Sequence, residues 1–468
     1  MSFNSSIFII CFMLFLALQG IVAGISGMRR WLILLFSLAF YWLLSSWGIL
    51  VLLFNGVADF FIARAIGNSK NNNTRRLWLY LSVVLNLGLI LCFRHCTQWF
   101  SLNQLLFWPA VAGVSFFVFR SLGYVLDVYH ENIDEPFESP IDYLAYLSFF
   151  PLILQGPISP ARDFLPELKN AFSWEKIHTG KAIFFLCSGI IKKFCLAAYL
   201  GANFTDRVFN SPHLFTGMEV TLASISQALL VFLDFSGYTD LMLGISLLLG
   251  FNIAENFNFP YTAGNITEYW RRWHMSLSKW LNEYLFFPLS FSLRALRKWG
   301  TVLAVIVTFT ISGFWHGTSL NYTFWGILHG LALSWDIAST ELRHKLKSLI
   351  PGFLYSSVSV ALTFAFLSLS GIYFRQENME TANAMLLQVF LQPDWHLFPQ
   401  WLKDFGGVFG VMLATLLLHW ILPKFYQRKI SFFENLPWPL HALALLVVIF
   451  VAYQVSGLEP VPFIYQKF

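Results

Sequence analysis

The chain has 468 residues, of which 57% are hydrophobic, 18% aromatic and only 12% charged. Soluble domains carry about 25% charged residues, so this composition excludes a soluble globular protein, and its many apolar residues exclude a disordered one. The formal net charge of +5 is small and scattered over short loops, so nucleic acid is not expected as a partner. The composition predicts an all-α, polytopic integral membrane protein in a lipid bilayer.

Crossing a bilayer takes about 20 apolar residues in a helix, so stretches free of charged residues predict the membrane spans. The first apolar run extends from Ile7 to Gly24 and lacks the basic start of a cleaved signal peptide. The pair Arg29–Arg30 follows it, and the positive-inside tendency places this pair in the cytosol. Residues 31–58 are expected to form two short helices that turn near Ser45–Gly48. The further candidate spans are 77–93, 104–126, 142–158, 180–200, 219–250, 300–316, 321–340, 350–374, 405–422 and 437–456.

The stretch from Asn252 to Trp299 is the most polar part of the chain, and we interpret it as a cytoplasmic surface. Within it, Asn265 followed by Glu268 predicts the start of a helix, because a capping pair has this three-residue spacing. Aromatic and apolar residues then recur every three or four positions up to Tyr284, which predicts one amphipathic helix. A basic helix with such a stripe is often an interfacial anchor, and this alternative stays open beside a functional one. The stripe consists of Trp270, Trp273, Leu277, Trp280, Leu281 and Tyr284, and the other face carries Arg271, Arg272, Lys279 and Glu283.

Three histidines are candidates for chemistry. His274 lies in the amphipathic segment and is either a structural hydrogen-bonding residue or part of a site. His316 and His329 lie in the uncharged stretch 301–335, where ionisable groups at membrane depth are costly and usually functional. The glycines on either side of His316 predict a helix break beside a cavity, where a neutral imidazole can act as a general base. A structural role is the alternative for both, and more so for His329.

Other polar residues receive structural interpretations. Asp234 and Asp240 point in different directions on a helix, so each is expected to cap a helix or to hydrogen-bond a polar neighbour rather than to form a carboxylate pair. The five cysteines lie in or beside apolar segments, which favours neither a disulfide framework nor a zinc site. We expect no metal site.

Six motifs in a fixed order resemble the membrane-bound O-acyltransferase superfamily. The similarity runs along most of the chain and is greatest to the bacterial branch with the alginate O-acetylase membrane subunit and the D-alanyl transfer protein of teichoic acid modification. The motifs are Ser148–Ile158 (SFFPLILQGPI), Asp234–Asp240 (DFSGYTD), Glu255–Tyr261 (ENFNFPY), Thr267–Ser278 (TEYWRRWHMSLS), Gly313–Gly317 (GFWHG) and Trp325–Gly330 (WGILHG).

This resemblance implies about eleven to thirteen transmembrane and re-entrant helices around a buried tunnel. Residues 1–130 would form N-terminal transmembrane helices, residues 131–345 the catalytic core with cytosolic amphipathic helices, and residues 346–468 the C-terminal transmembrane helices and tail. His316 matches the catalytic histidine of the family, and His274 matches a second histidine nearer the donor side. The expected donor-binding residues are Arg271, Arg272, Trp273 and Lys279, and the expected polar residues of the tunnel or its support are Asp234, Asp240, Asn256 and His329.

The resemblance also implies the reaction and its partners. The donor would be a thioester, either a short acyl-coenzyme A such as acetyl-coenzyme A or an acylated carrier protein, with no bound cofactor. The acceptor would be a hydroxyl of an extracytoplasmic polysaccharide, reached directly or through a periplasmic or extracellular partner transferase. The protein would be a multi-pass protein of the bacterial cytoplasmic (inner) membrane.

The C-terminal residues Phe463–Phe468 (FIYQKF) fit the F-x-Y-x-x-F hexapeptide that ends some proteins of this group or their small partners. In that pattern Tyr465 resembles an acyl acceptor that relays the group outward. The chain departs from the commoner form because it carries Gln466–Lys467, and an ordered tail without chemistry is the alternative.

Two other functions stay open at this point. One is D-alanyl transfer from a carrier protein to a cell-envelope polymer. The other is a transporter or flippase whose histidines couple protons to the movement of a polysaccharide or lipid-linked substrate, although no clear internal repeat of the kind that many transporters contain is present.

Overall fold

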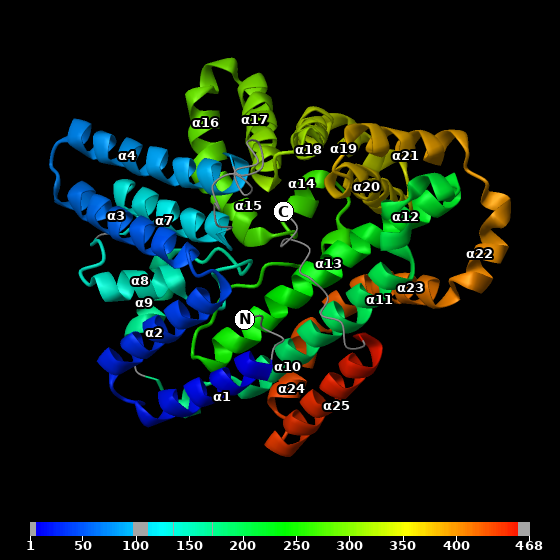
Figure 1. Ribbon diagram of the computed structural model, residues 1–468. Helices are drawn as coiled ribbons and strands as arrows, with labels where there is room; N and C mark the ends of the chain where they lie inside the picture. The colour runs from blue at the N-terminus through cyan, green and yellow to red at the C-terminus, as the bar shows by residue number, and fades with distance from the viewer. Residues whose placement is uncertain (1–5, 97–110, 134, 171, 457–468) are drawn as a thin grey trace. The chain divides into compact units, whose positions relative to one another are not determined.

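A computed structural model describes residues 6–96, 111–133, 135–170 and 172–456, and these residues form helices and loops without a strand (Figure 1). The all-α membrane class is confirmed, because nine helices among them are long and apolar enough to cross a membrane. The nine are Gly27–Leu44, Gly48–Asn68, Asn72–His95, Thr179–Asn210, Gly217–Leu248, Lys298–His316, Gly352–Arg375, Gly406–Lys424 and Trp438–Val455. The apolar helix Ile7–Ile21 is shorter.

The chain packs into two compact units. The first consists of Met1–Leu186 with Thr239–Glu255, and the second of Cys187–Tyr238 with Asn256–Phe468. The two units are defined by packing and do not test the three expected parts of the chain, 1–130, 131–345 and 346–468, which stay a prediction.

Most helices of the first unit follow the predicted spans. Of the predicted span 104–126, residues 104–110 lie outside the described residues, and its helix begins at Val114. The break between the second and third helices of the unit confirms the expected turn near Ser45–Gly48. The expected span 142–158 is wrong, because its helix ends at Ser148, shortly before Pro151, which lacks an N–H and restricts the residue before it. The helices are α1 (Ser6–Ile21), α2 (Ser26–Leu44), α3 (Gly48–Asn68), α4 (Asn72–Ile90), α7 (Val114–Tyr129), α8 (Pro140–Ser148), α9 (Ala161–Lys169) and the start of α10 (Thr179–Ile190).

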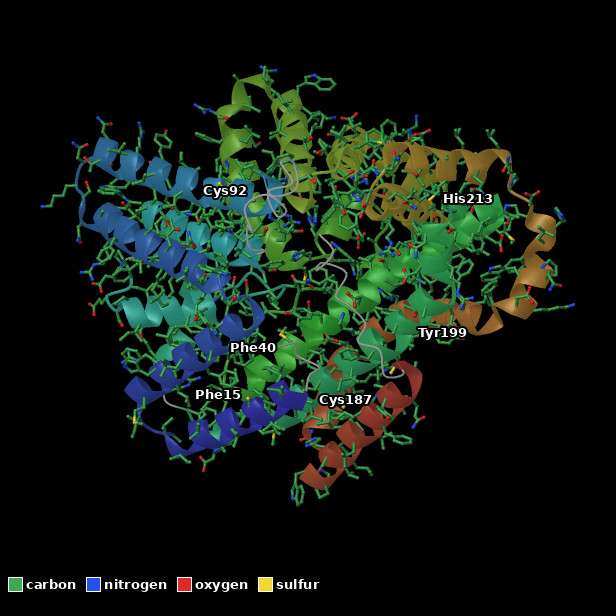
Figure 2. The ribbon with its side chains drawn as sticks, in the orientation of Figure 1. Phe15, Phe40, Cys92, Cys187, Tyr199 and His213 are labelled. Atoms are coloured by element: carbon green, nitrogen blue, oxygen red, sulfur yellow. The ribbon has the colours of Figure 1, made fainter. Side chains whose placement is uncertain are left out.

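Aromatic side chains form much of the core of this unit. Phe15 of α1 and Phe40 of α2, both labelled in Figure 2, pack on Phe150 with ring centroids 6.3 and 5.6 Å away. Arg29, which the sequence places in the cytosol, lies in the first turn of α2 and is only 2% exposed. Its guanidinium donates to the carbonyl oxygens of Asn170 and Leu249, because carbonyl groups at helix ends lack helical partners.

A second buried polar group of this unit is Asp59 in α3. Its carboxylate accepts hydrogen bonds from Ser82 Oγ (2.7 Å) and Asn86 Nδ2 (2.7 Å), both on α4. It also accepts one from Ser121 Oγ of α7 (2.6 Å). The three partners hold the apolar helices α3, α4 and α7 in one register, since a buried carboxylate must be hydrogen-bonded.

The second unit contains the predicted histidine motifs. Its spans at 300–316, 321–340, 350–374, 405–422 and 437–456 are confirmed as helices. Its helices are α11 (Ala198–Leu200), α12 (Asp206–Asn210), most of α13 (Gly217–Leu248), α14 (Ile266–Trp270), α15 (Met275–Leu281), α16 (Phe287–Ser292), α17 (Lys298–His316), α18 (Leu320–Ala338), α19 (Thr340–Leu349), α20 (Gly352–Arg375), α21 (Met379–Leu391), α22 (Phe398–Asp404), α23 (Gly406–Ile421), α24 (Tyr426–Glu434) and α25 (Trp438–Ser456). Helices α17 and α18 lie side by side in it (Figure 1).

The predicted amphipathic helix from Asn265 to Tyr284 is wrong as a single helix. Its start is confirmed, because the Asn265 side chain accepts from the backbone N–H of Glu268 (2.8 Å). The helix then breaks between α14 and α15, where His274 adopts a left-handed conformation with φ 43°. Because of this break, Trp270 and Trp273 are both buried inside the unit, rather than lying along one face of a single helix.

Candidate functional site

A cavity of about 70 Å³ lies within the second unit. Its wall comes from α13, α14, α15, α17, α18, α20 and the turns beside α14, and it brings together the three predicted histidines. The other lining side chains that bear polar atoms are Gln227, Tyr261, Tyr269, Trp270, Trp273 and Trp325. Among the described residues that line it, none is Asp, Glu, Lys or Arg. The cavity wall therefore carries no charge unless one of its histidines is protonated.

His316 ends α17, as the flanking glycines predicted. The helix stops at Gly317, and α18 begins after Ser319, whose side chain accepts from the N–H of Asn321. The imidazole is 3% exposed and lines the cavity. Its ring lies against the rings of Trp325 and Phe374, with centroids 5.4 and 5.0 Å away. The aromatic rings therefore cover most of the imidazole.

Glycines set the distance between α17 and α18. A Cβ built on Gly313 would lie 2.3 Å from the carbonyl oxygen of Tyr322, and one built on Gly326 would lie 2.3 Å from that of Phe309. Both contacts are with backbone atoms, which cannot rotate away. Only glycine at both positions allows the approach that holds His316 beside α18.

His274 has a defined proton position. Asn256 Oδ1 accepts from the backbone N–H of Ser276 (3.0 Å) and lies 3.3 Å from His274 Nδ1. Because a backbone N–H only donates, this amide atom is the oxygen, so Nδ1 of the imidazole carries the proton. Burial lowers the pKa of His274 to about 3. The ring is therefore neutral near pH 7, and its lone pair is on Nε2.

His329 lies on α18 in the same wall, but both of its nitrogens are engaged. The indole N–H of Trp270 donates to Nδ1 (3.3 Å), and Nε2 lies 3.3 Å from Ser370 Oγ. An indole N–H only donates, so Nδ1 holds the lone pair and Nε2 the proton. Because both nitrogens of His329 are hydrogen-bonded, the ring links α18 to Trp270 of α14 and to Ser370 of α20.

The residues expected to bind the donor fall in two places. Trp273 is buried and lines the cavity, as do Trp270 and Leu277, so the alternative of an interfacial anchor is wrong for these three. Arg271 and Lys279 are exposed and lie outside the cavity wall. The remaining one, Arg272, is half-buried and forms an ion pair of 2.6 Å with Glu268.

The other predicted polar residues are buried but do not line the cavity. Asp234 forms an ion pair with Lys193, and both side chains are almost fully buried. Asp240 lies further along α13 and is 9% exposed. Asn256 is not a lining residue, but its Oδ1 lies 3.3 Å from Nδ1 of His274, which is one. The predicted acyl acceptor Tyr465 lies outside the described residues.

Gln227 is a lining residue that the sequence reasoning missed. It lies on α13 and is 3% exposed. Its only signal in the sequence is a carboxamide within a long apolar span, where polar groups are costly.

Comparison with known proteins identifies the family of the chain. The model of the family described as "MBOAT, membrane-bound O-acyltransferase family" matches residues 134–349. The chain is 31% identical over 428 residues to a peptidoglycan O-acetyltransferase of Helicobacter pylori, covering 82% of this chain and 79% of the relative. It is 30% identical over 445 residues to a probable alginate O-acetylase of Pseudomonas fluorescens, covering 93% and 84%. A teichoic acid D-alanyltransferase of Bacillus subtilis is 27% identical over 268 residues, covering 54% and 66%. The chain belongs to the membrane-bound O-acyltransferase family and is a multi-pass membrane acyltransferase.

Proposed function

We propose that the protein transfers an acetyl group from a cytosolic thioester to a hydroxyl of an extracytoplasmic polysaccharide, in the cytoplasmic membrane of a bacterium. The observation that carries the proposal is the shared cavity of His316 and His274, which is buried, uncharged and lined by aromatic rings. The donor is acetyl-coenzyme A or an acetylated carrier protein, and a periplasmic or extracellular partner transferase completes the delivery where the acceptor lies further out.

In this mechanism His316 is the general base. It takes the proton from the attacking hydroxyl while the hydroxyl oxygen bonds to the carbonyl carbon of the thioester. The carbon–sulfur bond then breaks, and the leaving thiolate receives the proton, so that an ester and a thiol result. General base catalysis contributes about 10²–10⁴-fold to the rate, and exclusion of water from the cavity limits hydrolysis of the thioester.

His274 contributes a fixed acceptor. Its Nδ1 proton is held by Asn256, so Nε2 can accept a hydrogen bond from an N–H or O–H of either substrate. The exposed Arg271 and Lys279 supply positive charge outside the cavity, where coenzyme A phosphates or an acidic carrier protein would dock.

The size and charge of the cavity favour acetyl over other acyl groups. Its volume of about 70 Å³ is small, which supports a short acyl group such as acetyl. An acetyl group is neutral, so it needs no counter-ion from the wall.

D-alanyl transfer is the second candidate, because a teichoic acid D-alanyltransferase is among the relatives. The aromatic wall could hold the D-alanyl ammonium by cation–π contacts worth about 0.5–2 kcal/mol. Burying an ammonium without a carboxylate costs several kcal/mol, which favours acetyl. Labelled acetate and labelled alanine, fed in parallel to cells that make the protein, separate the two by which label reaches the cell-envelope polymer.

The test of acyl transfer is a strain in which His316→Ala replaces the wild-type protein at equal membrane levels. We expect acylation of the cell-envelope polymer to fall to the level of a deletion strain. The control is His441→Ala, which removes a buried histidine of α25 that does not line the cavity. Undiminished acylation in the His316→Ala strain would contradict the proposal.

A further inference from the structure

Gln227 presents a buried carboxamide without a protein partner in the cavity wall. The side chain is 3% exposed, and its Oε1 has no hydrogen bond with any residue in the part of the chain that the structure describes. It lines the cavity together with Val231, which lies one helical turn further along α13 on the same face. A half-turn of the terminal torsion exchanges oxygen and nitrogen, so either end of the amide can face the cavity.

A buried amide of this kind is costly when it stays unpaired. Leaving a polar group desolvated without a hydrogen bond is unfavourable, so an occupant of the cavity that forms a hydrogen bond with this amide is favoured. Among the described residues, none bonds to Gln227 Oε1, and the hydroxyl of the nearby Tyr261 donates instead to the Ala228 carbonyl. In the same cavity wall, the two nitrogens of His329 are engaged with Trp270 and Ser370.

The chemistry of the occupant follows from what an amide can do. A carboxamide N–H donates to a carbonyl oxygen, and it donates more strongly to the oxyanion that forms when a nucleophile adds to that carbonyl. An acyl group in the cavity brings one such oxygen and no other strong acceptor. Val231, the lining residue one helical turn from Gln227, is apolar, so on this face of α13 the amide is the group that can bond to such an oxygen.

We propose that Gln227 binds the carbonyl oxygen of the transferred acyl group and stabilises the oxyanion as the hydroxyl attacks. This inference rests on the proposed acyl transfer. It adds a group that acts on the carbonyl oxygen while His316 acts on the hydroxyl. His316 removes the proton from the hydroxyl, and Gln227 Nε2 donates a hydrogen bond to the oxygen on which negative charge develops. When the acyl donor is bound, the N–H of the Gln227 amide gains an acceptor in the cavity.

The kinetic test uses Gln227→Met, which keeps the length of the side chain and removes its donor and acceptor. Initial rates of acetyl transfer from labelled acetyl-coenzyme A to the cell-envelope polymer are measured in isolated membranes at saturating donor. We expect the maximal rate to fall about 10²–10³-fold, as when an oxyanion donor is removed. The matched control is Ser224→Ala on the same helix, whose hydroxyl bonds to the Val220 carbonyl and does not line the cavity, and its rate should equal that of the wild type.

A spectroscopic test reads the hydrogen bond itself. The probe is a methyl-ketone analogue of acetyl-coenzyme A, with a methylene in place of the thioester sulfur and ¹³C at the carbonyl. We expect the infrared carbonyl stretch to lie at lower frequency in the wild-type protein and in Ser224→Ala than in Gln227→Met. A purely structural role of Gln227 would not produce this difference.

The outcomes separate the two proposals. A Gln227→Met protein that transfers acetyl at the wild-type rate, or that leaves the carbonyl frequency unchanged, overturns the role of Gln227 while acyl transfer stands. If Gln227→Met does not fold, the spectrum of the analogue bound to the wild-type protein decides. A carbonyl frequency equal to that of the analogue in an aprotic solvent overturns the hydrogen bond from Gln227. A lower frequency supports it. Wild-type membranes that neither transfer acetyl nor bind the analogue overturn the proposed donor instead.

Discussion

Gly313 of α17 and Gly326 of α18 pack backbone to backbone, so that a Cβ built on either would lie 3.0 Å from the Cα of the other. The two helices carry His316 and His329 to the same cavity. The glycine contact therefore fixes the position of the proposed base, although neither glycine takes part in the chemistry.

The first prediction concerns Gly326→Ala. The added Cβ would meet the Phe309 carbonyl oxygen at 2.3 Å, and relief requires α17 and α18 to separate. Because a misplacement of about 1 Å can cost 10²-fold in rate, we expect acyl transfer to fall by roughly that factor, with a lower melting temperature in detergent. The control Gly410→Ala on α23 has nothing within 4 Å of its Cβ and should keep full activity with equal or greater stability. Equal rates in the two variants would contradict this account.

The second prediction concerns the buried pair Lys193 and Asp234, whose side chains are 0% and 5% exposed. Lys193→Met leaves a buried carboxylate without a partner, so it should lower the free energy of unfolding by about 3–5 kcal/mol. The double variant Lys193→Met with Asp234→Leu removes both charges and should recover most of that loss. Unfolding in detergent measures stability, and acyl transfer by the double variant tests whether the pair only supports the fold. A double variant as unstable as the single one would contradict the prediction.

The third prediction concerns acid stability. Burial lowers the pKa of His274 to about 3, whereas a histidine in an unfolded chain titrates near 6.5. Between these values the unfolded chain binds a proton that the folded protein does not, so the free energy of unfolding should fall as the pH drops below about 6.5. His274→Gln removes this contribution, and its melting temperature should depend less on pH from 7 to 4. Identical pH profiles for the two proteins would contradict the assignment.

The membrane spans could be predicted because the absence of charge over a helix length is a local property. The predicted span 300–316 corresponds to α17, and 405–422 corresponds to α23. The break after His316 was also local, since Gly313 and Gly317 frame it. The order of the histidine motifs, which resembles that of the family, predicts His274 and His316 as site residues.

What could not be predicted depends on partners far away in the sequence. The break at His274 is stabilised by bonds to Asn256, and the burial of Arg29 depends on carbonyl groups of other helices. The periodic spacing of apolar residues predicts neither the break at His274 nor the burial of Arg29. Gln227 stayed unnoticed for the same reason, because only the folded wall shows that its amide lacks a partner.

The last prediction concerns the tail. If Tyr465 accepts the acyl group and relays it outward, as the hexapeptide pattern indicates, then Tyr465→Phe should abolish delivery to the polymer while the protein accumulates normally, because only the hydroxyl is lost. Tyr453→Phe, on the exposed face of α25, controls for the loss of a tyrosine hydroxyl near the C-terminus and should stay active. Mass spectrometry of the C-terminal peptide during turnover should detect an acyl adduct on Tyr465 that alkali removes. A peptide that stays unmodified in an active protein, or full activity of Tyr465→Phe, would mean that the acyl group leaves the cavity directly for its acceptor.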